Sequence, residues 1–419
     1  MEILSTGEKI KRARIYKGIT LKEICDDKIS ISKMSCIENG KVKAEDWILE
    51  EVARKLDIDF KYLKQDVNEQ IEVSINSIKN LKDGEQLEKD ALYSLEYAKE
   101  YQLYDKAFDL MHILFNYYLS ISCFDKIQIS ISEYHFFLQK SWTDEKLLIY
   151  NYDIARYFSA NGEYSEALIY YKEIRKTLLE DSRINYRRLA ISTYHITETL
   201  IRINNIQEAY ELAKESLRLI DYLDSPKEKG LVYELLAIIS IKLEEGSFDK
   251  YLEKALEAYK DNEESKAKLY LKIGDEFFDK GNKEEALVHI KKSLDITTKE
   301  QEYGYTECLL SSIEKLIDNK YYVLAEELCE NALDKAIKTN KLNLIEKAYY
   351  LKALILKNQG SFIQAEMYMN FSLDTLLKYA GKEERYKRYL DVANMYYDIG
   401  EVKDSIKYFM LAFSEAKKI

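Results

Sequence analysis

Proline is the residue that most restricts the fold of this chain, because it is nearly absent. Pro226 is the single proline among 419 residues, and only 13 residues are glycine. Proteins built from strands and turns need many such chain breakers, so the sequence predicts an all-α fold. The chain is too long for one ordinary core, and its 47% hydrophobic and 33% charged residues argue against wholesale disorder. Several domains or an array of repeats is therefore expected.

The stretch from Ser30 to Lys41 has the pattern of a short capped helix. Ser30 is a typical N-cap residue, and Met34 and Ile37 fall on one face. Gly40 then provides the left-handed residue that commonly follows a helix C-terminus.

A second short helix is predicted just before this one. Thr20 and Glu23 have the spacing of a capping box, and Ile24 and Cys25 can face inward. A tight turn is predicted over residues 26–29. Two helices joined so closely cross at a steep angle, which lets the first lie over the DNA backbone while the second enters the major groove.

One pattern recurs from the Asp83-Gly84 break onward: a turn, often with Gly or Asn, and a small residue four or five positions later. Consecutive copies lie mostly about 40 residues apart, which predicts a helical solenoid. Eight or nine helical hairpins are expected, the first over residues 67–101 and the last over 382–417. Weaker copies lie near Phe124, Phe248 and Tyr322. The small residues allow the two helices of a hairpin to approach closely; they are Ala167, Ala209, Ala286, Ala325, Ala365 and Ser405 on second helices, and Gly274 and Ala393 on first helices.

Charge is distributed unevenly along the chain. Residues 1–66 hold 14 of the 63 Lys+Arg and 13 of the 74 Asp+Glu, so this segment has a net charge of +1 and the remainder of the chain has −12. An acidic repeat region does not suit phosphate binding. A basic cluster near the N-terminus fits either a nucleic-acid surface or an ordinary solvated helix face, and its members are Lys9, Lys11, Arg12, Arg14 and Lys17.

Other chemistry is not indicated. The five cysteines are widely spaced and lack a C-x-x-C pair, and the four histidines are isolated, so neither a disulfide framework nor a metal site is expected. No phosphate loop or nucleophile elbow is present, so we expect no cofactor and no enzymatic activity. No apolar run reaches membrane-spanning length and no signal-peptide core is seen, which predicts a cytoplasmic protein.

Residues 1–66 resemble the Cro/repressor-type helix-turn-helix domain, with its I-E-N-G signature at residues 37–40. The resemblance implies five short helices near residues 6–16, 20–25, 30–38, 44–56 and 59–64. The fourth would place Trp47, Leu49, Val52 and Leu56 in the core. In that family an arginine of the first helix commonly pairs with the glutamate of the signature, and the matching residues are Arg14 and Glu38.

The same resemblance implies a set of DNA contacts. Ile31, Ser32 and Cys36 would face base edges, while the sugar-phosphate backbone would be contacted by Ser30, Lys33, Ser35, Asn39 and Lys41. No Arg, Gln or Asn occupies a base-reading position, so bidentate readout is missing, although Ile31 suits a thymine methyl group. The alternative is a domain that keeps this fold but has lost DNA binding and serves dimerisation or protein contact.

The repeats resemble tetratricopeptide repeats, with HEAT-like repeats as the nearest rival. Such repeats form a right-handed superhelix whose first helices line a concave groove suited to an extended peptide. The repeat register places inward Tyr152, Arg156 and Ser159, then Tyr194, Glu198 and Arg202, and finally Asn394 and Tyr397. Asn and Arg can hold peptide backbone and carboxylates, and Tyr can pack on side chains. The alternative for each is an ordinary polar residue on an exposed solenoid face.

The whole chain resembles the RRNPP family of intracellular peptide-pheromone receptors. This implies a DNA-binding domain over residues 1–66, a linker helix over 67–84 and a peptide-binding and dimerisation domain over 85–419. The function implied is a quorum-sensing transcriptional regulator, a homodimer without membrane association. A short signalling peptide would change the curvature or dimer arrangement of the solenoid, and this would change the spacing of the two DNA-binding domains on an operator. The alternative function is a peptide-regulated module that sequesters or dephosphorylates a response regulator, and a bare scaffold is a third.

Overall fold

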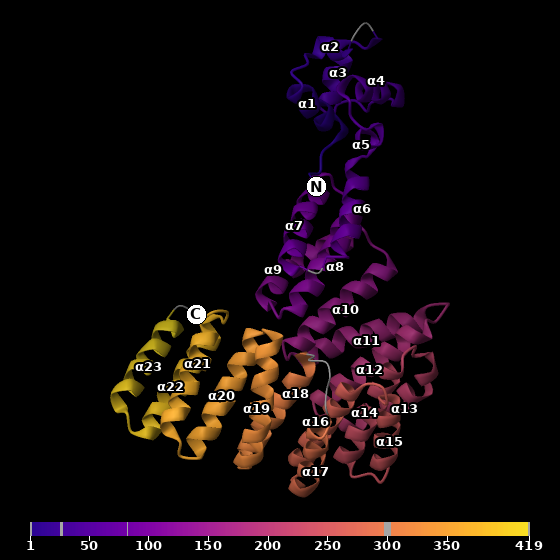
Figure 1. Cartoon of the computed structure of the whole chain (residues 1–419). Coiled ribbons are helices and arrows are strands. Elements are labelled where there is room, and N and C mark those ends of the chain that lie inside the picture. Colours follow the sequence, from indigo (N-terminus) through magenta and orange to yellow (C-terminus); the bar gives the residue numbers. More distant parts are fainter. Residues whose placement is uncertain (1, 26–27, 82, 297–302, 418–419) are drawn as a thin grey trace. The chain divides into compact units, whose positions relative to one another are not determined.

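The computed structural model describes residues 2–25, 28–81, 83–296 and 303–417. Within these ranges the chain forms 23 α-helices and no β-strand (Figure 1), so the predicted all-α class is confirmed. Pro226 is the first residue of α14 (Pro226–Leu243). A proline is tolerated there because the amide hydrogen it lacks would have no partner within the helix.

The chain forms two compact units, residues 1–185 and 186–419. The first unit contains α1 (Thr6–Tyr16), α2 (Leu21–Cys25), α3 (Ile31–Glu38), α4 (Asp46–Leu56), α5 (Phe60–Lys64), α6 (Val67–Ile78), α7 (Gly84–Glu100), α8 (Tyr104–Ser120), α9 (Phe124–Lys140), α10 (Asp144–Ala160) and α11 (Tyr164–Glu180). The second contains α12 (Tyr186–Arg202), α13 (Ile206–Arg218), α14, α15 (Phe248–Ala258), α16 (Glu263–Asp279), α17 (Lys283–Leu294), α18 (Tyr303–Asp318), α19 (Tyr322–Thr339), α20 (Leu342–Asn358), α21 (Phe362–Leu376), α22 (Lys382–Ile399) and α23 (Val402–Ala416).

The helices α1 to α5 surround a small core of their own and begin and end within two residues of the predicted positions. Leu49, Val52 and Leu56 are buried in that core as predicted. The prediction for Trp47 is wrong, because its side chain is 44% exposed and its indole Nε1 donates a hydrogen bond to Glu45. Trp47 is the second residue of α4 and precedes the buried pair Ile48 and Leu49, so the inward face begins one residue later.

The five-helix segment is attached to α6 by buried polar contacts. The side-chain amide of Gln70 accepts from the backbone N–H of Leu4 and donates to its carbonyl, at 3.2 and 2.8 Å. The ammonium of Lys9 in α1 donates to the carbonyls of Tyr62 and Gln65, at 2.6 and 2.7 Å, and burial lowers its pKa. These bonds satisfy backbone groups at the α5–α6 junction that would otherwise lack partners.

From α6 onward the helices follow one another in nine pairs, α6/α7 to α22/α23, which agrees with the predicted number of hairpins. The weak copies of the repeat are confirmed, because α9, α15 and α19 begin at the three predicted residues. A residue with positive φ lies in most of the turns within pairs. Four of these residues are glycines, namely Gly162, Gly281, Gly360 and Gly400. In other turns the residue is Ser122, Asn204, Glu244 or Lys320.

The small residues of the repeat lie where the two helices of a pair touch. All five alanines of the second helices are fully buried. Gly274 of α16 shows why: a Cβ there would lie 2.6 Å from Cγ1 of Ile290 and 3.1 Å from the carbonyl oxygen of Ala286 in α17. A larger side chain at this position would push the two helices apart.

Candidate functional site

Helix α3 is held against the five-helix core on one side only. Met34, Ile37 and Glu38 are buried, and Ser30 caps the helix by accepting a hydrogen bond from the backbone N–H of Lys33. Gly7 of α1 allows the two helices to approach, since a Cβ there would lie only 2.3 Å from the carbonyl oxygen of Ile37. The sequence therefore fixes α3 at both ends and along its inner face.

The predicted ion pair between Arg14 and Glu38 is present. Nε and Nη2 of Arg14 donate to the two carboxylate oxygens at 2.6 and 2.9 Å, and Nη1 donates to the carbonyl of Ile19 at 3.1 Å. The side chains are only 13% and 3% exposed. This bidentate pair joins α1, the turn before α2 and the C-terminus of α3.

The outer face of α3 carries the residues predicted to contact DNA, none of which is buried. Ser30, Ile31 and Ser32 are exposed at its N-terminal end, and Asn39 and Lys41 at its other end. Lys33, Ser35 and Cys36 are half-buried. The ammonium of Lys33 bonds to Glu45 at 2.8 Å and lies near the Trp47 ring, so it is not fully available to a phosphate.

The helix that precedes α3 begins as predicted. The hydroxyl of Thr20 accepts from the N–H of Glu23, whose carboxylate accepts from the N–H of Thr20. Asp26 and Asp27, half of the predicted turn, lie outside the described residues, while Ile29 is buried in the core.

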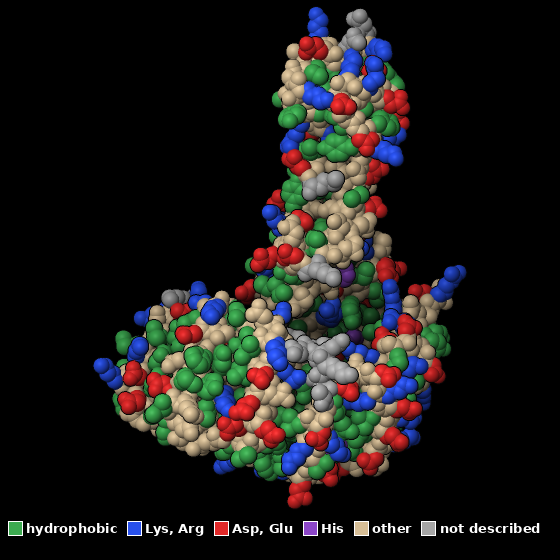
Figure 2. Space-filling view, viewed as in Figure 1, with side chains coloured by type: hydrophobic (Ala, Val, Ile, Leu, Met, Phe, Trp, Pro, Cys, Tyr) green, Lys and Arg blue, Asp and Glu red, His purple; other side chains and the backbone are tan. Residues whose placement is uncertain are grey.

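The N-terminal basic cluster does not form an open positive surface. Lys9 is buried, Arg14 pairs with Glu38, Arg12 pairs with Glu2 at 2.5 Å, and Lys17 lies 3.8 Å from Asp57. On the face drawn in Figure 2, Lys and Arg side chains over α1 to α5 alternate with Asp and Glu. Most of this cluster therefore has structural partners, which the sequence pattern alone left open.

In the first unit, a buried carboxylate organises a polar cluster between α8, α9 and α10. Oδ2 of the fully buried Asp153 lies 2.6 Å from Nδ1 of His112 and accepts from the Tyr134 hydroxyl at 2.9 Å. Burial and this carboxylate raise the pKa of Tyr134, which keeps its hydroxyl a donor. Asn116 lies 3.1 Å from Nδ1 of His112 and accepts from Nη1 of Arg156 at 2.5 Å. Oδ1 of Asp153 is buried without a hydrogen-bond partner in the described structure.

The predicted peptide contacts of this unit lie beside that cluster. The guanidinium of Arg156 lies 5.7 Å from the centroid of the Tyr152 ring. The centroids of the Tyr152 and Tyr171 rings are 6.3 Å apart. Tyr152, Arg156 and Ser159 are all half-buried on α10. Their side chains therefore form a mixed aromatic and cationic surface next to a buried acid.

In the second unit, charged side chains join three consecutive first helices, α14, α16 and α18. Nζ of Lys272 donates to Oε1 of Glu234 at 2.5 Å, and Oε2 accepts from the Tyr259 hydroxyl at 3.1 Å. Oδ1 of Asp275 accepts from the Ser312 hydroxyl at 2.9 Å. We call these residues, together with the predicted α12 contacts that adjoin them, the polar cluster of unit two. Its members are Tyr194, Glu198, Arg202, Glu234, Lys272, Asp275, Ser312 and Lys315.

Electrostatics connect the predicted residues of α12 to this cluster. Burial and the carboxylates of Glu198 and Glu234 raise the pKa of Tyr194. Although burial opposes its ionisation, His195, Lys272 and Arg202 hold the pKa of Glu198 below its ordinary value. Arg202 itself is exposed at the end of α12. Strongly perturbed titratable groups gathered on one surface are typical of binding sites.

Asp275 is the unusual acid of the polar cluster. Burial raises its pKa to about 7, against the opposing effects of Lys315 and of the Ser312 hydroxyl. The ammonium of Lys315 donates to the backbone carbonyl of Asp275 at 3.2 Å and to the carboxylate of Asp279 at 2.7 Å. The carboxylate of Asp275 therefore receives only partial compensation for its burial.

The remaining predicted peptide contacts, Asn394 and Tyr397, are exposed on α22. The structure does not place them within the polar cluster of unit two, since α22 is the fifth first helix after α12.

Sequence reasoning also missed His112, Asn116, Glu234 and Lys272. The repeat spacing was a usable signal for them: Asn116 precedes its partner Arg156 by 40 residues.

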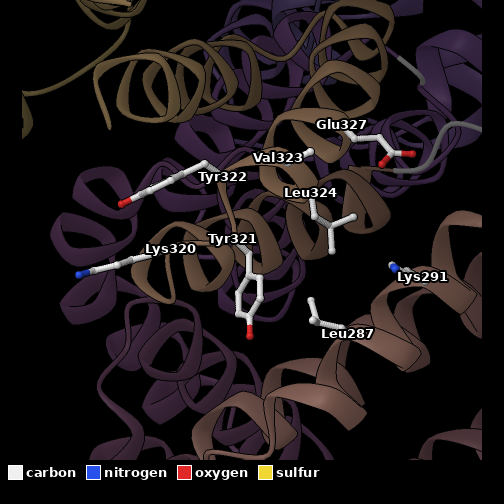
Figure 3. Close-up of a pocket in the computed structure, with 8 residues that line it drawn as sticks. All are labelled: Leu287, Lys291, Lys320, Tyr321, Tyr322, Val323, Leu324 and Glu327. Carbon is white, nitrogen blue, oxygen red and sulfur yellow. The ribbon is translucent and has the colours of Figure 1, made fainter. Parts of the chain in front are cut away.

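A surface cavity of about 390 Å³ lies between α17 and α19. Figure 3 shows Leu287 and Lys291 from α17 facing Tyr321 and Leu324, with Glu327 further along α19. These residues belong to or border second helices, so the cavity is separate from the polar cluster on the first helices.

Within the described ranges, no helix is long and apolar enough to cross a membrane. No group of three or more His, Cys, Asp or Glu side chains in those ranges is placed to hold a metal ion.

Comparisons with known proteins give only distant structural similarities. No family model matches this chain, and no curated protein matches it. Among solved structures, a Rap protein complexed with competence and sporulation factor is 14% identical over 84% of this chain and 98% of its own, with a TM-score of 0.47. The chain is structurally similar to RRNPP regulators.

Two Bacillus thuringiensis regulators show the same likeness. NprR in its apo form is 18% identical over 84% of this chain and 100% of its own, with a TM-score of 0.43. PlcR in complex with the peptide PapR7 and DNA is 17% identical over 61% of this chain and 94% of its own, with a TM-score of 0.35. Because these three identities are below 25% and these three TM-scores below 0.5, the function of this chain has to be inferred from its own residues.

Proposed function

We propose that this protein is a transcriptional regulator that binds an operator through α3 and is switched by a short linear peptide held on the first helices of its repeats. The observation that carries the proposal is the construction of α3. Its inner face and C-terminus are fixed by buried contacts to α1, and its N-terminal end is left exposed. A short rigid helix presented in this way suits the major groove.

The exposed residues of α3 favour readout of DNA shape and backbone over base identity. The Ser30 hydroxyl is already used as a cap and Lys33 is paired with Glu45, which leaves Ile31 and Ser32 as the exposed residues facing bases. Backbone N–H groups at the N-terminus of α3 and the exposed Lys41 and Lys43 then provide the phosphate contacts. We therefore expect specificity to depend on groove width and on the spacing of two half-sites.

The polar cluster of unit two supports the peptide part of the proposal. It combines a tyrosine, an acid held ionised by its neighbours and an exposed arginine at the end of α12. An extended peptide offers backbone donors and acceptors and a terminal carboxylate, which match these groups. A peptide that binds one shape of the repeats better than another would shift the population of shapes, and with it the position of α3.

DNA selection tests the first half of the proposal without knowledge of the operator. The full chain is incubated with a random duplex library, and bound DNA is sequenced through several rounds. We expect enrichment of a sequence with two related half-sites separated by whole helical turns. Recovery of DNA without any enriched sequence would contradict the proposal.

Peptide binding is tested with synthetic peptides from small reading frames beside the gene, using fluorescence anisotropy. Arg202→Ala is expected to weaken binding about tenfold, because it removes one charge-assisted hydrogen bond. Lys291→Ala is the matched control, since this lysine lines the separate cavity between α17 and α19. Equal effects of the two substitutions would rule out the polar cluster as the peptide site.

A second function has one observation in its favour. The predicted base-reading positions of α3, Ile31, Ser32 and Cys36, lack the Arg, Gln or Asn that bidentate base recognition requires, so residues 1–66 are also compatible with protein contact. In that case the chain is a peptide-regulated module that sequesters or dephosphorylates a response regulator. This function predicts a stable complex with such a protein that persists when residues 1–66 are deleted.

A further inference from the structure

One carboxylate receives hydrogen bonds from two helices beside the N-terminal end of α3. Oε1 of Glu45 accepts from Nζ of Lys33 in α3 at 2.8 Å, and Oε2 accepts from the indole Nε1–H of Trp47 in α4 at 2.7 Å. These two bonds hold the pKa of Glu45 below its ordinary value, so the carboxylate is ionised at neutral pH. A cation and a neutral donor therefore converge on one anion.

Glu45 is not used to stabilise the start of its own helix. It is the N-cap residue of α4, but its side chain makes no capping hydrogen bond. The next acid, Asp46, points to other partners and pairs with Lys64 of α5 at 2.6 Å. The side chains of Lys33 and Glu45 are 37% and 58% exposed. An exposed pair of this kind contributes little to stability, so another anion can displace the carboxylate at low cost.

We propose that Glu45 occupies the place of a DNA backbone phosphate, which Lys33 and Trp47 hold once the carboxylate is displaced, and that Glu45 thereby limits the affinity of α3 for DNA. The inference rests on the proposed operator binding and names a residue that regulates it. The unesterified oxygens of a phosphate accept hydrogen bonds as a carboxylate does, and lysine commonly binds phosphate as a point charge. The indole of tryptophan can only donate, which suits an anion.

The charge of the five-helix segment explains why a single carboxylate matters. Residues 1–66 hold 14 Lys+Arg against 13 Asp+Glu, a net charge of only +1. Most of the N-terminal basic cluster already has structural partners, whereas Lys41 and Lys43 are exposed between α3 and α4. Release of Lys33 therefore adds substantially to the cations available for phosphates. Because displacement of Glu45 is required on every duplex, it lowers non-specific occupancy without changing which bases are preferred.

Binding of the full chain to a labelled duplex of random sequence, measured by fluorescence anisotropy over a salt series, tests the proposal. Glu45→Gln is expected to bind about tenfold more tightly at low salt, because it removes a negative charge beside a phosphate and frees Lys33. The slope of log affinity against log salt should steepen by about 0.9, the contribution of one further phosphate contact. The tenfold gain should be the same on the operator recovered by selection.

Asp57→Asn is the matched control for the loss of one negative charge. Asp57 is the C-cap residue at the opposite end of α4, its side chain is 96% exposed, and it lies 3.8 Å from Lys17. Asparagine tolerates the positive φ at this position. The affinity of Asp57→Asn for DNA should change by less than about twofold, because solvent and salt screen a charge at this distance from α3.

Two further measurements assign the roles of the two donors. In a Lys33→Gln background, Glu45→Gln should no longer steepen the salt dependence, because the ammonium that would contact the phosphate is absent. Trp142→Phe leaves Trp47 as the single tryptophan, so a random duplex should change its emission with the same midpoint as the anisotropy. A bound complex in which the emission of Trp47 is unchanged would overturn its role in the site.

The outcomes separate this inference from the proposed function. Equal gains in Glu45→Gln and Asp57→Asn would show a general effect of net charge and overturn the inference, as would an unchanged salt slope in Glu45→Gln. Operator selection by the unmodified chain together with an inert Glu45→Gln would refute the inference alone. Tighter binding of Glu45→Gln without any enriched operator would support the phosphate site and contradict the proposed function. If none of these chains binds DNA, both are wrong.

Discussion

Removing the Glu38 carboxylate isolates the contribution of one buried ion pair to the position of α3. In Glu38→Ala, the Arg14 guanidinium loses both acceptors on the carboxylate and keeps only its bond to the Ile19 carbonyl. Arg14 cannot turn its charge to water without leaving the core, because its side chain is only 13% exposed. A buried, unpaired guanidinium is the expected result.

The magnitude follows from the geometry of the pair. Breaking a buried pair by removing one partner costs about 3–5 kcal/mol, mainly because the remaining charge is left uncompensated. At 25 °C, 1.36 kcal/mol corresponds to a factor of ten, so the opening of α3 should become about 150-fold to several thousand-fold more frequent. The exposed pair between Lys33 and Glu45 serves as the control, and Glu45→Ala should change the same equilibrium by less than about 1 kcal/mol.

Hydrogen exchange of α3 backbone amides in the full chain is the suitable assay, since it reports local opening when closing is fast. Faster exchange over residues 31–38 is expected in Glu38→Ala, and little change in Glu45→Ala. The double variant Arg14→Met, Glu38→Leu should recover most of the protection, because apolar side chains replace both charges. Unchanged exchange in Glu38→Ala, or a double variant as unprotected as the single one, would refute the reasoning.

Three further predictions follow from the same structure. Gly7→Ala should shift or loosen α3 and lower stability by about 1–3 kcal/mol, measured by the same exchange experiment, whereas Gly246→Ala, with open space around its Cβ position, should not. In the folded chain, Asp275 keeps its proton up to about pH 7, whereas in the unfolded chain it releases that proton near its ordinary pKa of 3.8. The free energy of unfolding therefore falls as pH rises between these two values. The thermal midpoint of Asp275→Asn minus that of the unmodified chain should therefore grow from pH 5 to pH 8. A difference independent of pH would contradict the raised pKa of Asp275. The double change Ser32→Ala, Lys33→Ala should abolish selection of the operator and leave peptide affinity unchanged, measured by gel shift and anisotropy; loss of both would show that the two sites are not separate.

The repeat pattern predicted most of the fold because it follows directly from backbone geometry. Gly162, Gly281 and Gly360 mark turns that require positive φ, and glycine adopts that conformation without strain. Ser122 and Lys320 have positive φ as well, yet their residue types give no such signal, which is why those copies of the repeat looked weak. The resemblance places Trp47 in the core, but helix phase decides burial, and the phase of Trp47 points outward.

The candidate sites were less predictable because they depend on which polar groups meet. Sequence identified Arg14 and Glu38 through a resemblance that contains both members of the pair. Nothing in the pattern indicated that Lys9 would be buried beneath the Gln65 carbonyl, since a lysine in a basic run normally faces water. Glu234 and Lys272 lie 38 residues apart and pair only because consecutive first helices are adjacent. Such contacts require the three-dimensional register of the repeats.

The buried bonds at the α5–α6 junction restrict how a signal from the repeats could reach α3. Gln70 holds the backbone of Leu4, and Lys9 holds the carbonyls that precede α6, so α1 is attached to α6 by side chains as well as by the chain itself. Helix α3 is in turn attached to α1 through Arg14. A bending motion at residues 65–66 would break several hydrogen bonds within a buried site, which is costly. In the proposed regulator, a signal from the repeats would therefore move the five-helix segment as a whole and not α3 alone.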